Sequence, residues 1–415
     1  MQITILAYGS RGDVQPYVAL GIGLQRAGHQ VRLAAPASFS GFVARYGLDF
    51  TPLAGDPRSM IRGLVDQAGG NPIRAVRVMA AYTFPLARQV ISDLLVACQD
   101  TDLVIHSFLL LGSGHAIAEM LGVPDIVTLT FPVLVPTGDF PVPMWPTLPL
   151  GRPYNRFTHV VSRSIFWWAN LAGYSWVRRI YPQLPRRLEW PFEGRRSVPA
   201  PTLCAFSPTV VPRPSDWGDH IHQTGYWFLE PESTWRPPED LLSFLREGPP
   251  PVYIGFGSMI TKQAPHLLKI ALSALKETGQ RGILASGWGG LALHDLPPWI
   301  YALDAAPHDW LFPRCAALVH HGGAGTTAAG LHAGKPTVIV PFSADQPFWG
   351  ERVYRVGAGS QPIPRRRLTA QKLASAIEFL ISDPGTAESA KSVGKEIAQE
   401  RGVDHAIEMI QNHTS

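Results

Sequence analysis

The segment from His320 to Thr327, which reads HHGGAGTT, combines residue types suited to binding an anion. It follows the apolar run 316–319 and precedes the helical pattern 328–333, so a strand, a glycine turn and a helix are predicted. Glycines let the backbone approach a ligand, and a helix start offers free amides and positive charge. A diphosphate is the natural ligand, although a tight turn with satisfied histidines is the alternative. The residues expected around the site are His320, His321, Gly322, Gly323, Gly325, Thr326 and Thr327.

The elements that must position this turn predict two doubly wound α/β domains. Strand and helix patterns alternate over residues 3–35 and 103–129, and again over 252–285 and 316–340, which is typical of parallel sheets. Residues 131–217 predict long loops and helices wrapped around a pocket rather than a second sheet, and 387–410 predicts an amphipathic helix. We therefore expect an N-terminal domain over 1–232, a proline-rich linker over 233–251, a C-terminal domain over 252–385, and a terminal helical segment over 386–415 that packs back towards the first domain.

Composition narrows the class of protein. Hydrophobic residues form 46% and charged residues 16% of the 415 residues, which indicates a well-buried globular chain. A formal net charge of +4 is too small to predict a nucleic-acid surface. The three cysteines, Cys98, Cys204 and Cys315, have neither paired nor metal-site spacing, so a reducing compartment is expected. With no signal-peptide pattern and no long apolar window, the expected location is cytoplasmic or peripheral at the inner membrane face.

Five separated motifs occur in an order that resembles one enzyme family: GSRGDVQP at 9–16, GFGS at 255–258, PHDWLF at 307–312, HHGGAGTT, and DQPFWGERV at 345–353. The chain resembles nucleotide-sugar-dependent UDP-glycosyltransferases of the GT-B fold, especially the sterol glucosyltransferases and the bacterial natural-product glycosyltransferases. The resemblance implies two facing Rossmann-like domains, with the donor bound mainly by the second and the acceptor by the first. It also implies inversion at the anomeric carbon, with the nucleotide sugar as co-substrate and no further cofactor.

The resemblance assigns roles around the donor. His321 would contact the diphosphate and Ser258 a phosphate, while Asp345 and Gln346 would hydrogen-bond the sugar hydroxyls and the backbone of His308 would contact the base. The places where plant relatives hold a base-stacking tryptophan and a ribose-binding glutamate read Ala305 and Ala329 here, and Trp288 is an alternative platform for the base. UDP is favoured over dTDP by the likeness to the sterol branch.

Transfer needs a base that removes the proton from the acceptor hydroxyl, and Asp13 is the candidate. It lies in the loop after the first predicted strand with Ser10, Arg11 and Gly12, where open α/β sheets bind ligands. Asp13 could instead cap the following helix. In plant relatives a histidine occupies this place and a later aspartate orients it, and that later place aligns with His106 here. Asp13 and His106 are therefore predicted as a dyad in which either could carry the proton.

Two further features concern metal and acceptor. The acidic run Asp100–Asp102 precedes its strand and thus lies at the wrong edge for catalysis, so metal-independent transfer is expected. Residues 164–190 mix aromatic side chains with arginines, which favours either peripheral membrane contact or a helix packed across the acceptor pocket. Both interpretations predict a bulky apolar acceptor such as a sterol.

Alternatives from other classes remain testable. Glucose from UDP-glucose is the favoured transferred group, and a polyketide, macrolide or aromatic natural product is the alternative acceptor. A sugar-nucleotide 2-epimerase would share the fold and the diphosphate site, and would turn over donor without acceptor. A non-catalytic lipid- or nucleotide-binding relative would bind donor without hydrolysing it.

Overall fold

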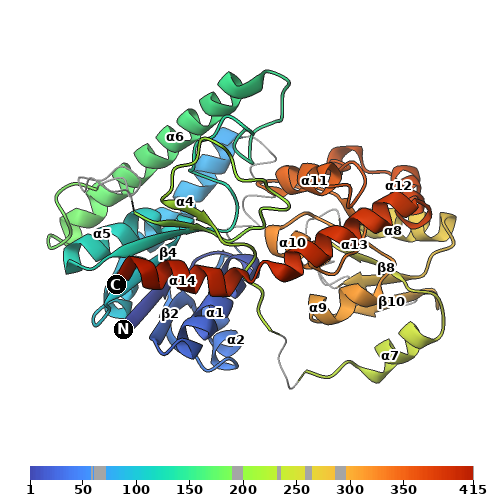
Figure 1. The fold of residues 1–415 in the computed structure, drawn as a ribbon, viewed down its shortest axis with the longest axis horizontal. Helices are drawn as coiled ribbons and strands as arrows, with labels where there is room; N and C mark the ends of the chain where they lie inside the picture. Colours follow the sequence, from blue (N-terminus) through green and yellow to red (C-terminus); the bar gives the residue numbers. More distant parts are fainter. Residues whose placement is uncertain are drawn as a thin grey trace.

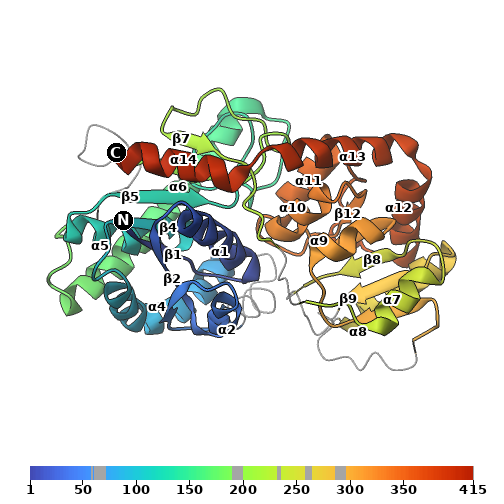
Figure 2. The same ribbon diagram turned by 60° about the horizontal axis from the view of Figure 1, so that its bottom comes forward.

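A computed structural model describes residues 1–57, 59, 72–188, 200–230, 235–257, 264–285 and 296–414. It contains two parallel β-sheets, each flanked by helices, in two domains that lie side by side (Figures 1 and 2). The predicted α/β class with two Rossmann-like domains is confirmed.

The N-terminal sheet has seven strands among the described residues, all parallel. In spatial order they are β3 (Asp49–Leu53), β2 (Gln30–Pro36), β1 (Gln2–Leu6), β4 (Leu103–Ser107), β5 (Asp125–Leu129), β6 (Thr202–Cys204) and β7 (Ile221–Gln223). The helices of this domain are α1 (Arg11–Arg26), α2 (Ser40–Ala44), α4 (Pro72–Ala97), α5 (Leu111–Leu121) and α6 (Gly151–Ile180). The expectation that 131–217 forms no second sheet agrees with the described residues, because β6 joins the first sheet beside β5 and α6 follows the loops.

The C-terminal sheet is also parallel, with five strands in the described ranges. In spatial order they are β10 (Ile300–Leu303), β9 (Gly282–Ala285), β8 (Val252–Gly255), β11 (Ala317–His320) and β12 (Thr337–Ile339). Around it lie α7 (Glu239–Arg246), α8 (Ala264–Glu277), α9 (His308–Leu311), α10 (Ala324–His332), α11 (Gln346–Arg355) and α12 (Ala370–Ser382). The apolar strand residues are almost fully buried, as parallel sheets covered on both faces require.

The C-terminal segment crosses from one domain to the other as two helices, α13 (Pro384–Gln399) and α14 (Gly402–Thr414) (Figure 2). The single helix predicted over 387–410 is wrong, because Arg401 has a left-handed φ of 47° and breaks it. A Cβ on Gly402 would lie 2.3 Å from the carbonyl oxygen of Tyr226, so the chain turns tightly against the N-terminal domain there. Beyond the turn, α14 packs on α1, where Val403 and Ile407 contact Gly23.

Candidate active site between the two domains

The glycine turn after β11 is shaped by His320. Its Nδ1 accepts a hydrogen bond from the N–H of Gly322 at 3.0 Å, and the side chain is fully buried. Gly322 has a φ of +89°, and a Cβ there would lie 2.6 Å from Ile339, so no larger residue fits. Burial lowers the pKa of His320 well below its usual value, and the ring is neutral. His320 therefore holds the turn rather than a ligand.

The neighbouring His321 lies on the glycine-lined side of the turn. A Cβ on Gly323 would lie 2.6 Å from its Nε2, and a Cβ on Gly257 would lie 3.0 Å from its Cε1. Burial lowers the pKa of His321 to about 4, and the carbonyl of Gly255 acts in the opposite direction. Its Nδ1 is buried without a hydrogen-bond partner of good geometry. A neutral imidazole whose Nε2 lies beside Gly323, at the start of α10, is suited to a polar ligand that enters the turn.

The start of α10 completes this anion-binding arrangement. Gly323 is the N-cap, and no side chain caps it among the described residues. The first amides of the helix, from Ala324 to Thr326, therefore have no acceptor within the helix. Thr326 is half-buried at this end, whereas Thr327 is buried and faces the packed side of α10. Free amides at a helix start next to His321 match the chemistry of a diphosphate site.

Asp13 belongs to the other domain, and its negative charge acts on Asp345 at the start of α11. Its Oδ2 accepts hydrogen bonds from the backbone N–H of Ser10 at 2.7 Å and from the Ser10 hydroxyl at 2.8 Å. Ser10 is the N-cap of α1, and Asp13 occupies the third helical position rather than the cap itself. Burial raises the pKa of Asp13, and the two Ser10 hydrogen bonds oppose that rise. The loop is close to α10, because a Cβ on Gly325 would lie 3.7 Å from the Cα of Gly12.

The predicted dyad between Asp13 and His106 is wrong as a contact. His106 is fully buried, and its Nε2 is 2.8 Å from Oδ2 of Asp125, which also receives Nδ1 of His115 at 2.9 Å. The ring packs under α5, where a Cβ on Gly114 would lie 2.8 Å from it. Successive strand side chains point to opposite faces of a sheet, so His106 at the end of β4 faces the helical layer. This network ties β4, β5 and α5 together beneath the cleft.

Asp345 and Gln346 begin α11 beside the glycine turn. Oδ2 of Asp345 accepts a hydrogen bond from Nε1 of Trp349 at 2.7 Å. Burial raises the pKa of Asp345 to about 6, and the negative charge of Asp13 adds to the rise. Oε1 of Gln346 accepts the backbone N–H groups of Phe342 and Ser343 at 2.7 and 3.1 Å, so this oxygen shapes the loop.

The remaining donor residues divide into two groups. His308 begins α9 and stacks on Phe312 with ring centroids 4.3 Å apart. Burial lowers the pKa of His308 to about 4, and the positive charge of Arg11 from the other domain contributes. Ser258 and Trp288 lie outside the described residues.

Sequence reasoning missed Trp349, the hydrogen-bond donor to Asp345. The signal is its position four residues after Asp345, which brings the two side chains together once this segment is known to be helical.

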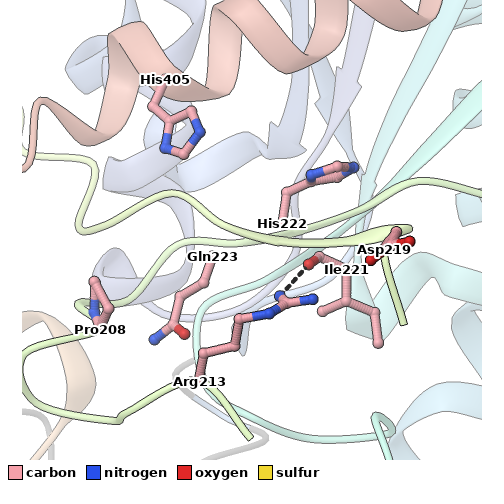
Figure 3. Close-up of a pocket in the computed structure, with 7 residues that line it drawn as sticks. All are labelled: Pro208, Arg213, Asp219, Ile221, His222, Gln223 and His405. Atoms are coloured by element: carbon pink, nitrogen blue, oxygen red, sulfur yellow. Dashed lines mark hydrogen bonds between the residues drawn. The ribbon is translucent and has the colours of Figure 1, made fainter. Parts of the chain in front are cut away.

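Two other features of the described structure, a pocket beside β7 and the carboxylate of Asp102, have contacts that support the backbone. A pocket of about 280 Å³ beside β7 and α14 is lined by Arg213, His222 and His405 among others (Figure 3). There Arg213 donates to the carbonyls of Ile221 and Gly218 and so supports the backbone. Asp102, at the amino end of β4, accepts the N–H of Gln2 at 2.8 Å. Within the described ranges, no cluster of three metal-ligating side chains occurs, and no helix has the length and apolar character to cross a bilayer.

Comparison with known sequences identifies the family of the chain. Residues 3–136 match the glycosyltransferase family 28 N-terminal domain, and residues 288–409 match the erythromycin biosynthesis protein CIII-like C-terminal domain. A sterol 3-beta-glucosyltransferase of Arabidopsis thaliana is 39% identical over the whole chain, which spans 68% of that relative. The O-mycaminosyltylonolide 6-deoxyallosyltransferase of Streptomyces fradiae is 35% identical over 99% of the chain and 97% of its own length. Fungal sterol 3-beta-glucosyltransferases are longer, and the chain spans 27% to 33% of them.

The fold agrees with the sequence comparisons. The crystal structure of the glycotransferase of kitacinnamycin superposes with a TM-score of 0.72 at 20% identity, covering 100% of this chain and 99% of that one. At that identity the likeness establishes the fold, and the relatives at 35% and 39% identity establish the family. The protein therefore belongs to the GT-B glycosyltransferases, as a hexosyltransferase with a family 28 N-terminal domain and an erythromycin CIII-like C-terminal domain.

Proposed function

We propose that the protein transfers glucose from UDP-glucose to a hydroxyl of a bulky apolar acceptor, of which a sterol is the first choice. Support for the acceptor comes from the 39% identity with the plant sterol 3-beta-glucosyltransferase over the whole chain. The observation that carries the proposal is the approach of the Asp13 loop to the free end of α10, through Gly12 and Gly325. A base and an anion-binding turn on opposite domains are what an inverting transfer between two bound substrates requires.

In the proposed mechanism Asp13 accepts the proton of the acceptor hydroxyl while that oxygen attacks the anomeric carbon. The attack comes from the face opposite the diphosphate, so configuration is inverted. Burial raises the pKa of Asp13 and thereby makes its carboxylate a stronger base. The departing diphosphate is stabilised by the first amides of α10 and by the His321 ring.

On the donor sugar, Asp345 is the proposed hydrogen-bond acceptor. Its carboxylate is held by Trp349, so it is oriented before the sugar arrives. Gln346 keeps its predicted role only through the atoms not used by the loop, because its Oε1 already accepts two backbone amides. Transfer without a metal ion remains part of the proposal.

A second acceptor class is favoured by one specific observation. The Streptomyces fradiae relative acts on O-mycaminosyltylonolide according to its name, and the chain covers 97% of it at 35% identity. A macrolide or polyketide is therefore the alternative acceptor, and dTDP the alternative nucleotide. In the sterol case the proposal includes peripheral membrane contact through 164–190, because sterols reside in bilayers.

A mass-spectrometric transfer screen tests the proposal. UDP-glucose, UDP-galactose, UDP-glucuronate and dTDP-glucose are each paired with sterols, flavonoids, macrolides and lipids. We expect the mass of one hexose to be added to a sterol with UDP-glucose, and the NMR spectrum of the product to show the β configuration. Transfer only to macrolides would select the second acceptor class. Epimerised donor without acceptor, detected by NMR because epimers have equal mass, or donor binding without turnover, would replace the proposal with one of the other two classes.

A further inference from the structure

Helix α6 has an inner and an outer face with different surroundings. Its inner face, through Trp167, Tyr174 and Val177, packs on the core shared with α4 and α5. The outer face carries Phe157, Ile165 and Trp168, which lie within about 80° of one another around the helix, and Val160 at its edge, on the side towards Trp167. We call these four residues the α6 outer face.

The α6 outer face is uncovered. Trp168 is 70% exposed, Val160 59%, Phe157 57% and Ile165 51%, and Leu150 just before the helix is also exposed. Large apolar side chains that gather on one exposed surface mark an interaction site, whereas single ones are ordinary. The helix runs along the outer edge of the N-terminal domain (Figure 1), and its 30 residues span about 45 Å. Among the described residues, only Trp145 has a ring contact with the face, edge-on to Phe157 at a centroid distance of 6.3 Å.

Charge indicates what kind of partner fits this surface. Residues 151–188 contain no aspartate or glutamate, and their seven arginines are Arg152, Arg156, Arg163, Arg178, Arg179, Arg186 and Arg187. Arg152 and Arg156 form ion pairs with Asp216. Arg179, Arg186 and Arg187 are exposed and make no ion pair within the described part of the chain. An apolar face followed along the same segment by exposed arginines complements an anionic lipid surface.

We propose that the α6 outer face docks on an anionic membrane surface. Phe157 and Trp168 enter the boundary between headgroups and acyl chains, and Arg179, Arg186 and Arg187 contact lipid phosphates. This inference rests on and deepens the proposed function, because a bilayer would deliver an apolar acceptor to the domain on which α6 packs. The membrane segment expected from sequence, 164–190, thereby extends back to Phe157 and loses Trp167, which faces inward.

Vesicle flotation of the full chain, without donor or acceptor, tests the docking. We expect binding to vesicles of phosphatidylcholine with phosphatidylglycerol and much weaker binding to pure phosphatidylcholine. Trp168→Ser, alone and with Phe157→Ser, should reduce the bound fraction at least about tenfold with the unfolding temperature preserved. The matched control is Phe379→Ser with Ile381→Ser on α12, which are 44% and 41% exposed on the other domain, and it should bind as wild type does.

Two outcomes would overturn the docking. Docking is contradicted if the wild-type protein floats with neither kind of vesicle. If the wild type is then a dimer and Trp168→Ser is a monomer, the face binds a second copy of the chain. Equal loss in the α12 control would show non-specific adhesion. The transfer assay is read separately, with acceptor dispersed in detergent. Vesicle binding without transfer contradicts the proposed function alone, whereas transfer without vesicle binding contradicts the docking alone.

Discussion

Gly12 and Gly325 belong to different domains, yet a Cβ on Gly325 would lie 3.7 Å from the Cα of Gly12. Both glycines stand in the first turn of a helix, α1 and α10 respectively. Two helix starts thus face each other across the cleft, one carrying Asp13 and the other carrying the free amides of the glycine turn. The absence of side chains on these two glycines lets the two helix starts approach each other closely.

The short distance between Gly12 and Gly325 predicts that only a small side chain fits at position 325. Alanine should be accepted, because 3.7 Å is an ordinary contact distance and alanine favours a helix by about 1 kcal/mol over glycine. Leucine should push the two helix starts apart and lower kcat/KM about tenfold or more, while the unfolding temperature is unchanged or higher. Steady-state kinetics and thermal unfolding of both variants provide the check. Wild-type kcat/KM in Gly325→Leu would contradict the narrow cleft.

The two adjacent histidines should separate into a fold role and a donor role. His321→Ala should weaken donor binding by about 1.5–3 kcal/mol, the value of a hydrogen bond to a charged group, and leave unfolding nearly unchanged. His320→Ala should instead lower the unfolding temperature, because it removes the acceptor for Gly322 and empties a buried site. Calorimetric titration with UDP-glucose and thermal unfolding distinguish the two. Equal donor affinity in His321→Ala and wild type would remove His321 from the site.

The raised pKa of Asp345 predicts that the free energy of unfolding depends on pH. Its pKa is raised to about 6 in the folded state, so its protonated form stabilises the fold at low pH and this stabilisation is lost as pH rises towards 6. Asp345→Asn keeps an acceptor for Trp349 and cannot ionise. Relative to wild type, the variant should therefore gain unfolding temperature between pH 4 and pH 7, by roughly 2–4 °C for each kcal/mol. Parallel stability curves for the two proteins over this interval would contradict the raised pKa.

Below the cleft, His106 should act on stability rather than on the chemical step. His106→Ala leaves Asp125 with only His115 as its hydrogen-bond partner, which should cost about 1–3 kcal/mol in the free energy of unfolding. The two histidines hold the pKa of Asp125 well below its usual value, so its carboxylate stabilises the fold at neutral pH and this stabilisation is lost in acid. The difference in stability between variant and wild type should therefore be largest at neutral pH and shrink as the pH falls below about 4. Chemical denaturation at neutral and acidic pH measures both effects. A loss of kcat with unchanged stability would restore His106 as a catalytic candidate.

The sequence predicted the strands that are continuous apolar runs and the glycine turn between β11 and α10, because buried parallel strands and turn glycines have strong local signals. It missed β3, which contains Pro52 at the sheet edge, and the short strands β6, β7 and β10. The last three have only three or four residues, too few to show a period of two, and the proline in β3 argues against a strand there. The break between α13 and α14 depends on contact of Gly402 with Tyr226, which is a tertiary effect.

Within the site, residue types were predictable and side-chain directions were not. His320 and His321 read alike in sequence, and only their alternation about the strand end sends one into the fold and the other towards the turn. The mistaken pairing of Asp13 with His106 also came from an unknown side-chain direction. The hydrogen-bond partner of His106 is Asp125, which in sequence looked like an ordinary strand start. Trp349 needed the helix register of α11 before its bond to Asp345 could be inferred.

The proton acceptor is the central claim, and Asp13→Asn tests it most directly. Asparagine can still accept a hydrogen bond from Ser10 but cannot take up the proton, so the variant should fold as wild type does. The measurement is the single-turnover rate of hexose transfer from UDP-glucose to a sterol at saturating substrates, with unfolding temperature measured alongside. We predict a fall of about 10²-fold or more at an unchanged unfolding temperature. A single-turnover rate within about twofold of wild type would show that Asp13 only caps α1 and that another group takes the proton.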